Sequence, residues 1–555
     1  MAPFSCTSFP SIASWTPEKK SAPFVLVFSL LFVQSLFAAG HSTRGTLDSS
    51  SWHPLERSLS DPLVLRHASN SATSSTADSF IEWSAYATVQ YSPGARLQGS
   101  WVQLPTAGGL GWVTGLDVFG KHHKLTWQAN LDHWRVAGVR ESDWNEAWQW
   151  GVWDGMGRAW NPNAADIAVL RTTGHLAYQV SPSVQLKCGQ EPHHWGQGWR
   201  SLWMDRQASP LPFASLQVRL KRLEYTHLIA RTQHLGVGSP PAIPTNGRNH
   251  PGSYATRRGA WMAAHAVEVE LGRGWKGALF GAVTWLNNDS GYTHRFEAAY
   301  ALPFISFRPT EYAVGSADNA IMGASLSWAP RWADERLLFY SQIVLDELVV
   351  SEIRSGDGWW ANKWGALGAI QWISPNRMWR LVAEGAAVRP FTYSHASNVQ
   401  SWTHRNGPLA HPAGSNFIEG RLHMQWKRND WKVRLGCVWM RQGMDEPTPL
   451  GVTPNLTVGA DPLNSYITRP ADYGIDLIWD GGGLIDQAGI QENLRWWGDI
   501  AFSLPPLEGQ EVFIRGFLRN ETMAQAAPDW WRAAPDWWRI ELGIRLENIL
   551  EERNW

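Results

Sequence analysis

The stretch from Trp538 to Leu546 alternates strictly between apolar and polar positions, in the order WRIELGIRL. A repeat of two residues places all the apolar side chains on one face of a β-strand, whereas a helix would mix the two kinds. The sequence therefore predicts a β-strand with one apolar face and one polar face. The chain then ends on an aromatic residue, Trp555, which together with such a strand is typical of the closing strand of a bacterial outer-membrane barrel.

The same alternation recurs from about Ile81 onward, for example over residues 125–131, 320–328 and 418–426. In three further segments the apolar face has a tryptophan at each end, namely Trp275 and Trp285, Trp364 and Trp372, and Trp431 and Trp439. A tilted strand of about 9–11 residues crosses a bilayer, and tryptophan favours both membrane interfaces. The spacing favours strands whose apolar face meets lipid, with one tryptophan of each pair at each interface. A soluble sandwich of two stacked sheets is the alternative.

Strands and turns of this size amount to roughly 16–20 strands, within the range of outer-membrane barrels. Turn-forming residues separate them at 287–291, 428–430 and 481–483, and longer loops are expected over 236–252 and 444–470. Residues 144–160 interrupt the pattern and are expected to form an irregular or helical insert. The repeated AAPDWWR motif over 526–539 is expected to lengthen the last hairpin loop. The predicted fold is all-β, a large antiparallel transmembrane β-barrel.

The N-terminus has the pattern of a secretory signal peptide. Lys19 and Lys20 precede an apolar run from Phe24 to Ala39, and small residues follow around Gly40. A transmembrane anchor is the alternative, although the run is short for one. We therefore predict a signal peptide over residues 1–40, a flexible extension over 41–79 and the barrel over 80–555, which places the protein in the outer membrane of a Gram-negative cell.

The net charge and the tryptophan content restrict the classes of function that are possible. The formal net charge of −1 opposes nucleic-acid binding, which requires a basic surface. The 37 tryptophans suit membrane interfaces better than a soluble core. Beyond the signal region only Cys188 and Cys437 occur. An unpaired Cys437 is expected because it falls on an apolar position, and a disulfide between the two is the alternative.

Two motifs carry the candidate chemistry, one over residues 191–202 and one over 403–416. In the first, the flat rings of Trp195 and Trp199 suit the C–H faces of sugars, and Arg200 suits an acidic glycan. The alternative is a tight loop inside the barrel in which Arg200 pairs with an inward carboxylate. In the second motif, a glycan-contacting loop competes with a turn held by polar side chains. The candidate glycan-binding residues are His194, Trp195, Gln197, Trp199, Arg200, His404, Asn406, His411 and Asn416.

These motifs resemble those of a known family. The block WGQGWRSL at 195–202, the SPLP at 209–212 and the GPLAHPAGSN at 407–416 are similar to the capsule-assembly Wzi family. Related gliding-motility outer-membrane proteins are also similar. The resemblance implies a single-chain outer-membrane barrel of about eighteen strands, closed toward the periplasm by helical and loop plug material. It also implies attachment of capsular polysaccharide without catalysis.

Other chemistry finds little support in the sequence. Glu191, His193 and His194 cluster, but adjacent histidines on a strand point to opposite faces and suit one metal ion poorly. No nucleophile elbow, zinc-protease motif or phosphate loop occurs, so neither a cofactor nor a metal is expected. The expected partners are surface polysaccharide and outer-membrane lipid, with motility or secretion proteins as further candidates. A solute channel or a motility component is the second hypothesis, and a barrel enzyme acting on lipid or glycan is the third.

Overall fold

The computed structural model describes residues 79–92, 109–137, 152–153, 157–163, 166–234, 259–286, 296–302, 318–330, 336–355, 359–405, 407–443, 445, 457–469, 490–503, 510–523 and 537–546. The predicted signal peptide and nearly all of the predicted extension lie outside them, as do the turns at 287–291 and 481–483 and most of the repeated AAPDWWR motif. Within the described ranges, no helix is long and apolar enough to cross a membrane.

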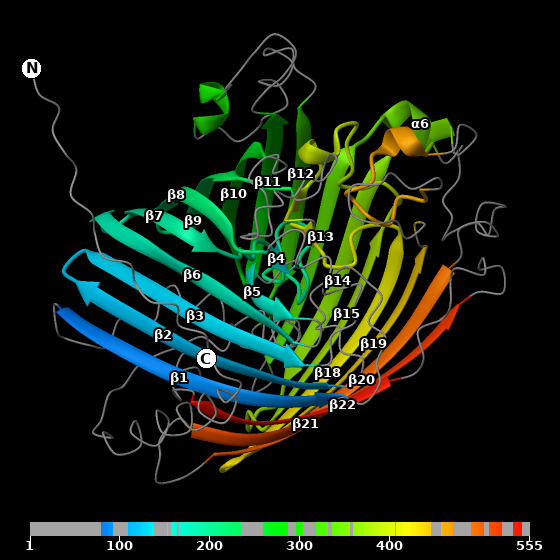
Figure 1. Cartoon of the computed structure of the whole chain (residues 1–555). Helices are drawn as coiled ribbons and strands as arrows, with labels where there is room; N and C mark the ends of the chain where they lie inside the picture. The colour runs from blue at the N-terminus through cyan, green and yellow to red at the C-terminus, as the bar shows by residue number, and fades with distance from the viewer. Residues whose placement is uncertain are drawn as a thin grey trace, which may run out of the picture. The chain divides into compact units, whose positions relative to one another are not determined.

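The described residues are almost entirely β-structure (Figure 1). The long strands are β1 (Ser79–Ser92), β2 (Gly109–His122), β3 (Leu125–Ala137), β6 (Asp166–Ser181), β7 (Val184–Glu191), β8 (Leu211–Arg219), β9 (Leu223–Arg231), β10 (Ala260–Gly272), β11 (Trp275–Leu286), β12 (Asn319–Trp328), β13 (Arg336–Glu347), β14 (Lys363–Ile373), β15 (Trp379–Val388), β18 (Phe417–Arg428), β19 (Trp431–Gly443), β20 (Ile490–Ser503), β21 (Gln510–Met523) and β22 (Trp537–Leu546). The short elements are β4 (Val152–Trp153), β5 (Gly157–Asn163), η3 (Ala298–Ala301), α6 (Val350–Ser355), η4 (Asn398–Gln400), β16 (Thr403–His404), β17 (Gly407–Pro408) and η5 (Tyr466–Thr468).

The long strands pair in a cyclic order. Each is antiparallel to the next, and β22 pairs with β21 on one side and with β1 on the other. The sheet has 20 strands in the described residues, and all of them except β4 and β5, hence 18, take part in this cycle. The predicted large antiparallel β-barrel is therefore confirmed as the fold, with a strand number in the expected range.

The two ends of the barrel differ in their connections. Short turns join β2 to β3, β6 to β7 and β18 to β19, the last at the predicted Asn429–Asp430. Long connections follow β7, β13, β15 and β19 at the opposite end. The long connections after β7 and β15 enter the interior of the barrel, here called the lumen, from this long-loop end. We call these two connections together the plug.

Alternation along the strands is inverted relative to a soluble protein. On β18, Leu422 is 62% exposed whereas Glu419 is 2% exposed and Arg421 and His423 are buried. The polar face packs against the lumen segments, while the apolar face forms the outside of the barrel. Strands β3, β12 and β19 show the same partition, as the sequence pattern predicted.

A belt of aromatic side chains runs around part of the outside, near the short-turn end. Trp275 and Trp328 stack with ring centroids 5.3 Å apart, and Trp328 stacks on Phe339 at 5.5 Å. The belt continues through Trp372 on β14 to two further pairs, Trp379 with Trp426 at 6.3 Å and Trp431 with Phe502 at 4.9 Å. Eight successive strands of the cycle, from β11 to β20, thus contribute one aromatic residue each. We call this set the aromatic belt.

Two expectations were wrong. Trp285 does not reach an interface, because it is fully buried beneath Phe296 and Tyr300 of the η3 segment, which lies against the outer face of β11. The stretch over 144–160 was expected to be irregular or helical, but its described parts form β4 and the start of β5.

Cys188 and Cys437 are both free, and Cys437 lies half-exposed on the outer face of β19.

Candidate functional site

Two inserts fill the part of the lumen enclosed by β8 to β19. The first insert comprises residues 192–210 between β7 and β8, and the second comprises residues 389–416 between β15 and β18. Their apolar side chains merge with the inner faces of the surrounding strands into one buried cluster. Both candidate motifs belong to these inserts, so the contacts that hold the inserts also fix the candidate residues.

Two tryptophans join the inserts to each other and to the wall. The indole N–H of Trp203, in the first insert, donates to the carbonyl oxygen of Ile343 on β13 at 2.8 Å. The indole N–H of Trp402, in the second insert, donates to the carbonyl oxygen of Trp203 at 2.7 Å. The Trp203 ring lies so close to Gly323 of β12 that a Cβ there would sit 2.2 Å from its Nε1. Glycine is required at this position because the ring packs directly on the strand backbone.

Arg200 connects the first insert to β18 by charge. Its guanidinium forms a buried ion pair with the carboxylate of Glu419. The Nε2 atom of His411, in the second insert, lies 3.4 Å from the other carboxylate oxygen of Glu419. Arg421 on the same strand lies 3.6 Å from it as well. A single inward carboxylate therefore holds both inserts, which is the structural alternative considered for Arg200.

Glu384 of β15 provides the second charged anchor. Its carboxylate accepts a hydrogen bond from the backbone N–H of Trp199 at 2.7 Å and another from the hydroxyl of Tyr340 at 2.8 Å. The guanidinium of Arg421 lies 3.8 Å from Glu384 and so links the two anchors. A buried charge requires such partners, because an unpaired one would cost several kcal/mol. We call Arg200, Glu384, Glu419 and Arg421 the charged anchor.

Trp199 contributes its ring to this packing. Its indole makes an edge-to-face contact with His423 at 4.6 Å, and the guanidinium of Arg421 lies 5.0 Å from its centroid. The side chain is only 3% exposed. The ring therefore has no free face on which a sugar could stack.

The remaining candidates of the first motif support the insert. The Nε2 atom of His194 lies 3.1 Å from the carbonyl oxygen of Gly198, and its Nδ1 lies 3.5 Å from the Asp205 carboxylate. Burial alone would raise the pKa of Asp205, but His194 and Arg206 outweigh it and keep that pKa below its usual value. Trp195 is half-buried against Phe280, and Gln197 is half-buried beside it in the chain.

The candidates of the second motif also hold the backbone. His404 accepts from the N–H of Gln233 at 3.0 Å, and its other ring nitrogen lies 3.1 Å from the carbonyl oxygen of Pro210. Burial lowers the pKa of His411, and Glu419 opposes that effect. Asn416, with a φ of 54°, donates to the carbonyl oxygen of Val458 at 2.8 Å. Asn406 lies outside the described residues. The structure thus brings the two motifs together, but as parts of one packed plug.

The residues of β13 and β15 that hold the plug were not predicted from the sequence. Gln342 accepts a hydrogen bond from the N–H of Leu202 at 2.9 Å, Glu384 accepts one from the N–H of Trp199, and Tyr340 supports Glu384 by donating to it. Each is a polar residue at an inward-facing position of its strand, and this pattern was visible in the sequence. In the part of the chain that the structure describes, no group of His, Cys, Asp or Glu side chains is arranged to hold a metal ion.

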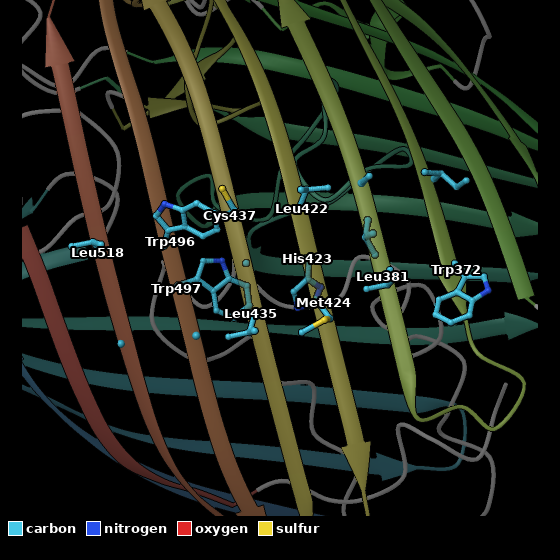
Figure 2. Close-up of a pocket in the computed structure, with 16 residues that line it drawn as sticks. Trp372, Leu381, Leu422, His423, Met424, Leu435, Cys437, Trp496, Trp497 and Leu518 are labelled. Atoms are coloured by element: carbon cyan, nitrogen blue, oxygen red, sulfur yellow. The ribbon is translucent and has the colours of Figure 1, made fainter.

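An apolar groove lies on the outer side of the barrel, across β14 to β21 (Figure 2). Its volume is about 900 Å³, and its lining includes Leu381, Leu422, Leu435, Trp496 and Leu518. Gly498 and Gly516 also line it, and their lack of side chains helps to make the surface concave. The groove is part of the apolar outer face, on the far side of the strands from the plug.

No protein-family model matches the sequence, and no curated protein is similar to it. Several solved structures are similar in fold. Wzi of Escherichia coli, an outer-membrane protein involved in group 1 capsule assembly and a carbohydrate-binding β-barrel, shares 12% identity over 91% of this chain and 90% of its own, with a TM-score of 0.48. The outer-membrane protein OpdK of Pseudomonas aeruginosa shares 8% identity over 84% and 97% of the two chains, with a TM-score of 0.41. OccAB1 of Acinetobacter baumannii shares 9% identity over 85% and 98%, with a TM-score of 0.42.

Proposed function

We propose that this protein is a non-catalytic β-barrel of the Gram-negative outer membrane that binds or organises surface polysaccharide. The observation that carries the proposal is the combination of an apolar outside with an aromatic belt and an anchored plug in the part of the lumen enclosed by β8 to β19. The apolar outside supports a membrane location. The plug supports a rigid scaffold rather than an open pore.

The membrane location is supported by the partition of side chains. Charged groups such as Glu419 and Arg421 face inward, where they find partners, while Leu422, the residue after Arg421, faces outward. The aromatic belt is typical of a membrane interface, since indole rings suit the boundary between acyl chains and headgroups. In the proposed location, acyl chains fill the outer groove, and an export signal over 1–40 delivers the chain.

The packed lumen favours a binding scaffold over the alternative of a channel. The plug is held by the charged anchor and by the hydrogen bonds of Trp203 and Trp402, so it is built as part of the wall. The carboxylates of the charged anchor and the histidines of the two motifs are engaged in contacts that hold the plug. This supports a structural role for them rather than a catalytic one. A rigid scaffold loses little conformational entropy when it binds a flexible polymer.

Deletion of the gene in its host tests the proposal. We expect a strain that still synthesises surface polysaccharide but releases more of it into the medium, measured as cell-bound against free polymer. An unchanged ratio would contradict the polysaccharide role. Reconstitution in liposomes tests the channel, because an anchored plug predicts swelling rates in small sugars close to those of empty vesicles. Rapid swelling would favour the channel instead.

A further inference from the structure

Three aromatic side chains and an arginine form a partly exposed cluster at the long-loop end, away from the two motifs. Trp359 and Trp360 precede β14, and Tyr466 and Arg469 belong to the η5 segment. The rings of Trp360 and Tyr466 lie 5.4 Å apart at 49°, and the guanidinium carbon of Arg469 lies 3.6 Å from the centroid of Trp360. All four side chains are half-buried. We call this set the rim platform; η5, in orange, lies near α6 in Figure 1.

The rim platform is held from below by buried charge. The ammonium group of Lys363 lies 5.0 Å from the centroid of the Tyr466 ring, in position for a cation–π contact. Lys363 is itself fully buried and pairs with Asp346 at 3.0 Å and Glu347 at 3.2 Å. Tyr466 is thereby tied to the ends of β13 and β14.

Hydrogen bonds fix the η5 turn that carries Tyr466. The hydroxyl of Ser465 accepts from the N–H of Ile467 at 3.2 Å and donates to the carbonyl oxygen of Ala396, in the second insert, at 2.8 Å. Thr468 donates to the carbonyl oxygen of Ser465 at 2.7 Å. A surface that is ordered before binding loses little conformational entropy when a ligand binds.

Arg469 covers one face of Trp360 and supplies hydrogen-bond donors there. Its Nη1 donates to the carbonyl oxygen of Tyr466 at 3.3 Å, which holds the guanidinium in place over Trp360. Its Nε is buried without an acceptor among the described residues, so the N–H groups left for a ligand are those of the two Nη atoms. N–H groups in a fixed plane suit hydroxyl or carboxylate oxygens.

We infer that the rim platform binds a pyranose unit of the surface polysaccharide, an inference that rests on the proposed function. A pyranose presents C–H groups on its faces and hydroxyls around its edge. Flat rings beside fixed polar donors therefore match both parts of the sugar. Trp199, deep in the plug, offers no such face, because it is only 3% exposed. The polysaccharide contact thus lies on the rim platform, above the plug.

Binding to an array of immobilised bacterial capsular polysaccharides, some neutral and some containing uronic acids, tests the inference. The purified full-length protein in detergent is compared with Trp360→Ala, Arg469→Gln and the control Trp431→Ala, which removes an indole from the aromatic belt. We expect Trp360→Ala to weaken binding about three- to tenfold, the range of one aromatic contact. Trp360→Phe should recover part of the loss, and Trp431→Ala should bind as the wild type does.

The outcomes separate the two proposals. If the wild type binds no polymer, the proposed function and the rim platform both fail. If the wild type binds but Trp360→Ala and Arg469→Gln bind equally well, the proposed function stands and the rim platform is wrong. A loss with Arg469→Gln confined to the uronate-containing polymers identifies a carboxylate as the partner of Arg469. An equal loss on neutral polymers identifies hydroxyls instead.

Discussion

Arg200 and Glu419 form a buried ion pair across 219 positions of the chain. One residue belongs to an insert and the other to the barrel wall, so the contact forms only when the strands between them have been laid side by side. The pair therefore links the folding of the plug to the closure of the barrel.

Removing both partners of this pair should cost less stability than the two single removals added together. We expect Arg200→Met to lower the free energy of unfolding by about 3–5 kcal/mol, because it leaves the buried Glu419 carboxylate with poorer compensation. The double variant Arg200→Met, Glu419→Met should lose less than the sum of the two single variants. Urea titration of the protein folded in lipid vesicles measures these values. Additive losses would mean that the two groups do not interact in solution.

The close approach of Trp203 to Gly323 gives a second prediction. Gly323→Ala places a methyl group against the indole and against the carbonyl oxygen of Ile343, 2.7 Å from the new Cβ. We expect a destabilisation of about 1–3 kcal/mol, typical of overpacking. Gly368→Ala on β14 is the matched control, since nothing lies within 4 Å of its Cβ. Equal stability of the two variants in the same urea titration would contradict the packing of the plug on β12.

The outward position of Leu422 predicts how the barrel meets lipid. Leu422→Arg should destabilise the inserted protein by about 2–4 kcal/mol, the cost of a cation on the lipid face near the bilayer centre. Leu220→Arg serves as the control, because Leu220 is equally exposed but lies in the short turn between β8 and β9. Folding yields in vesicles, read from the shift between folded and unfolded bands on gels, provide the measurement. If Leu422→Arg is as stable as Leu220→Arg, this face does not contact hydrocarbon.

Asp461 makes the segment after β19 sensitive to pH. Burial, helped by the nearby Asp445 carboxylate, raises the pKa of Asp461 to about 7, and the hydrogen bond from the N–H of Leu463 opposes this rise. The folded segment therefore holds a proton that an unfolded aspartate loses near pH 4. Stability should be greatest below that pH and should fall as the pH rises toward and through 7. Proteolysis between residues 457 and 469 should be faster at pH 8 than at pH 5.5, relative to a protease-matched standard. The variant Asp461→Asn should lose this dependence, and a wild type with equal rates would contradict the assignment.

Much of the barrel sheet could be predicted from the sequence, because which face each side chain occupies depends only on the local alternation of residues. The alternation on β18 requires only that Leu422 and Arg421 face opposite sides, and a period of two guarantees this in any strand. The tryptophan at the start of β19, Trp431, lies in the aromatic belt for the same reason. Strand number followed from segment length alone.

The plug could not be predicted in this way. Arg200 pairs with Glu419, and Glu384 and Gln342 accept hydrogen bonds from the first insert, because of which strands border the lumen beside that insert. A local repeat of apolar and polar residues does not contain this information. Trp285 was mispredicted for the same reason. It lies on the outer face of its strand as the alternation predicted, but its exposure depends on the η3 segment that covers it. The rim platform was missed because Trp360 and Tyr466 are separated by about a hundred residues and carry no shared motif.

The seam between β1 and β22 is short, with Ala87 to Tyr91 paired against Ile540 to Ile544. It also joins strands from opposite ends of the chain, so loop-closure entropy makes it the slowest ladder to form during assembly. Until it forms, two strand edges remain open and can pair with another nascent copy. The yield of correctly assembled protein will therefore depend on how fast this seam closes relative to encounter between chains, and crowding at the insertion site will lower it.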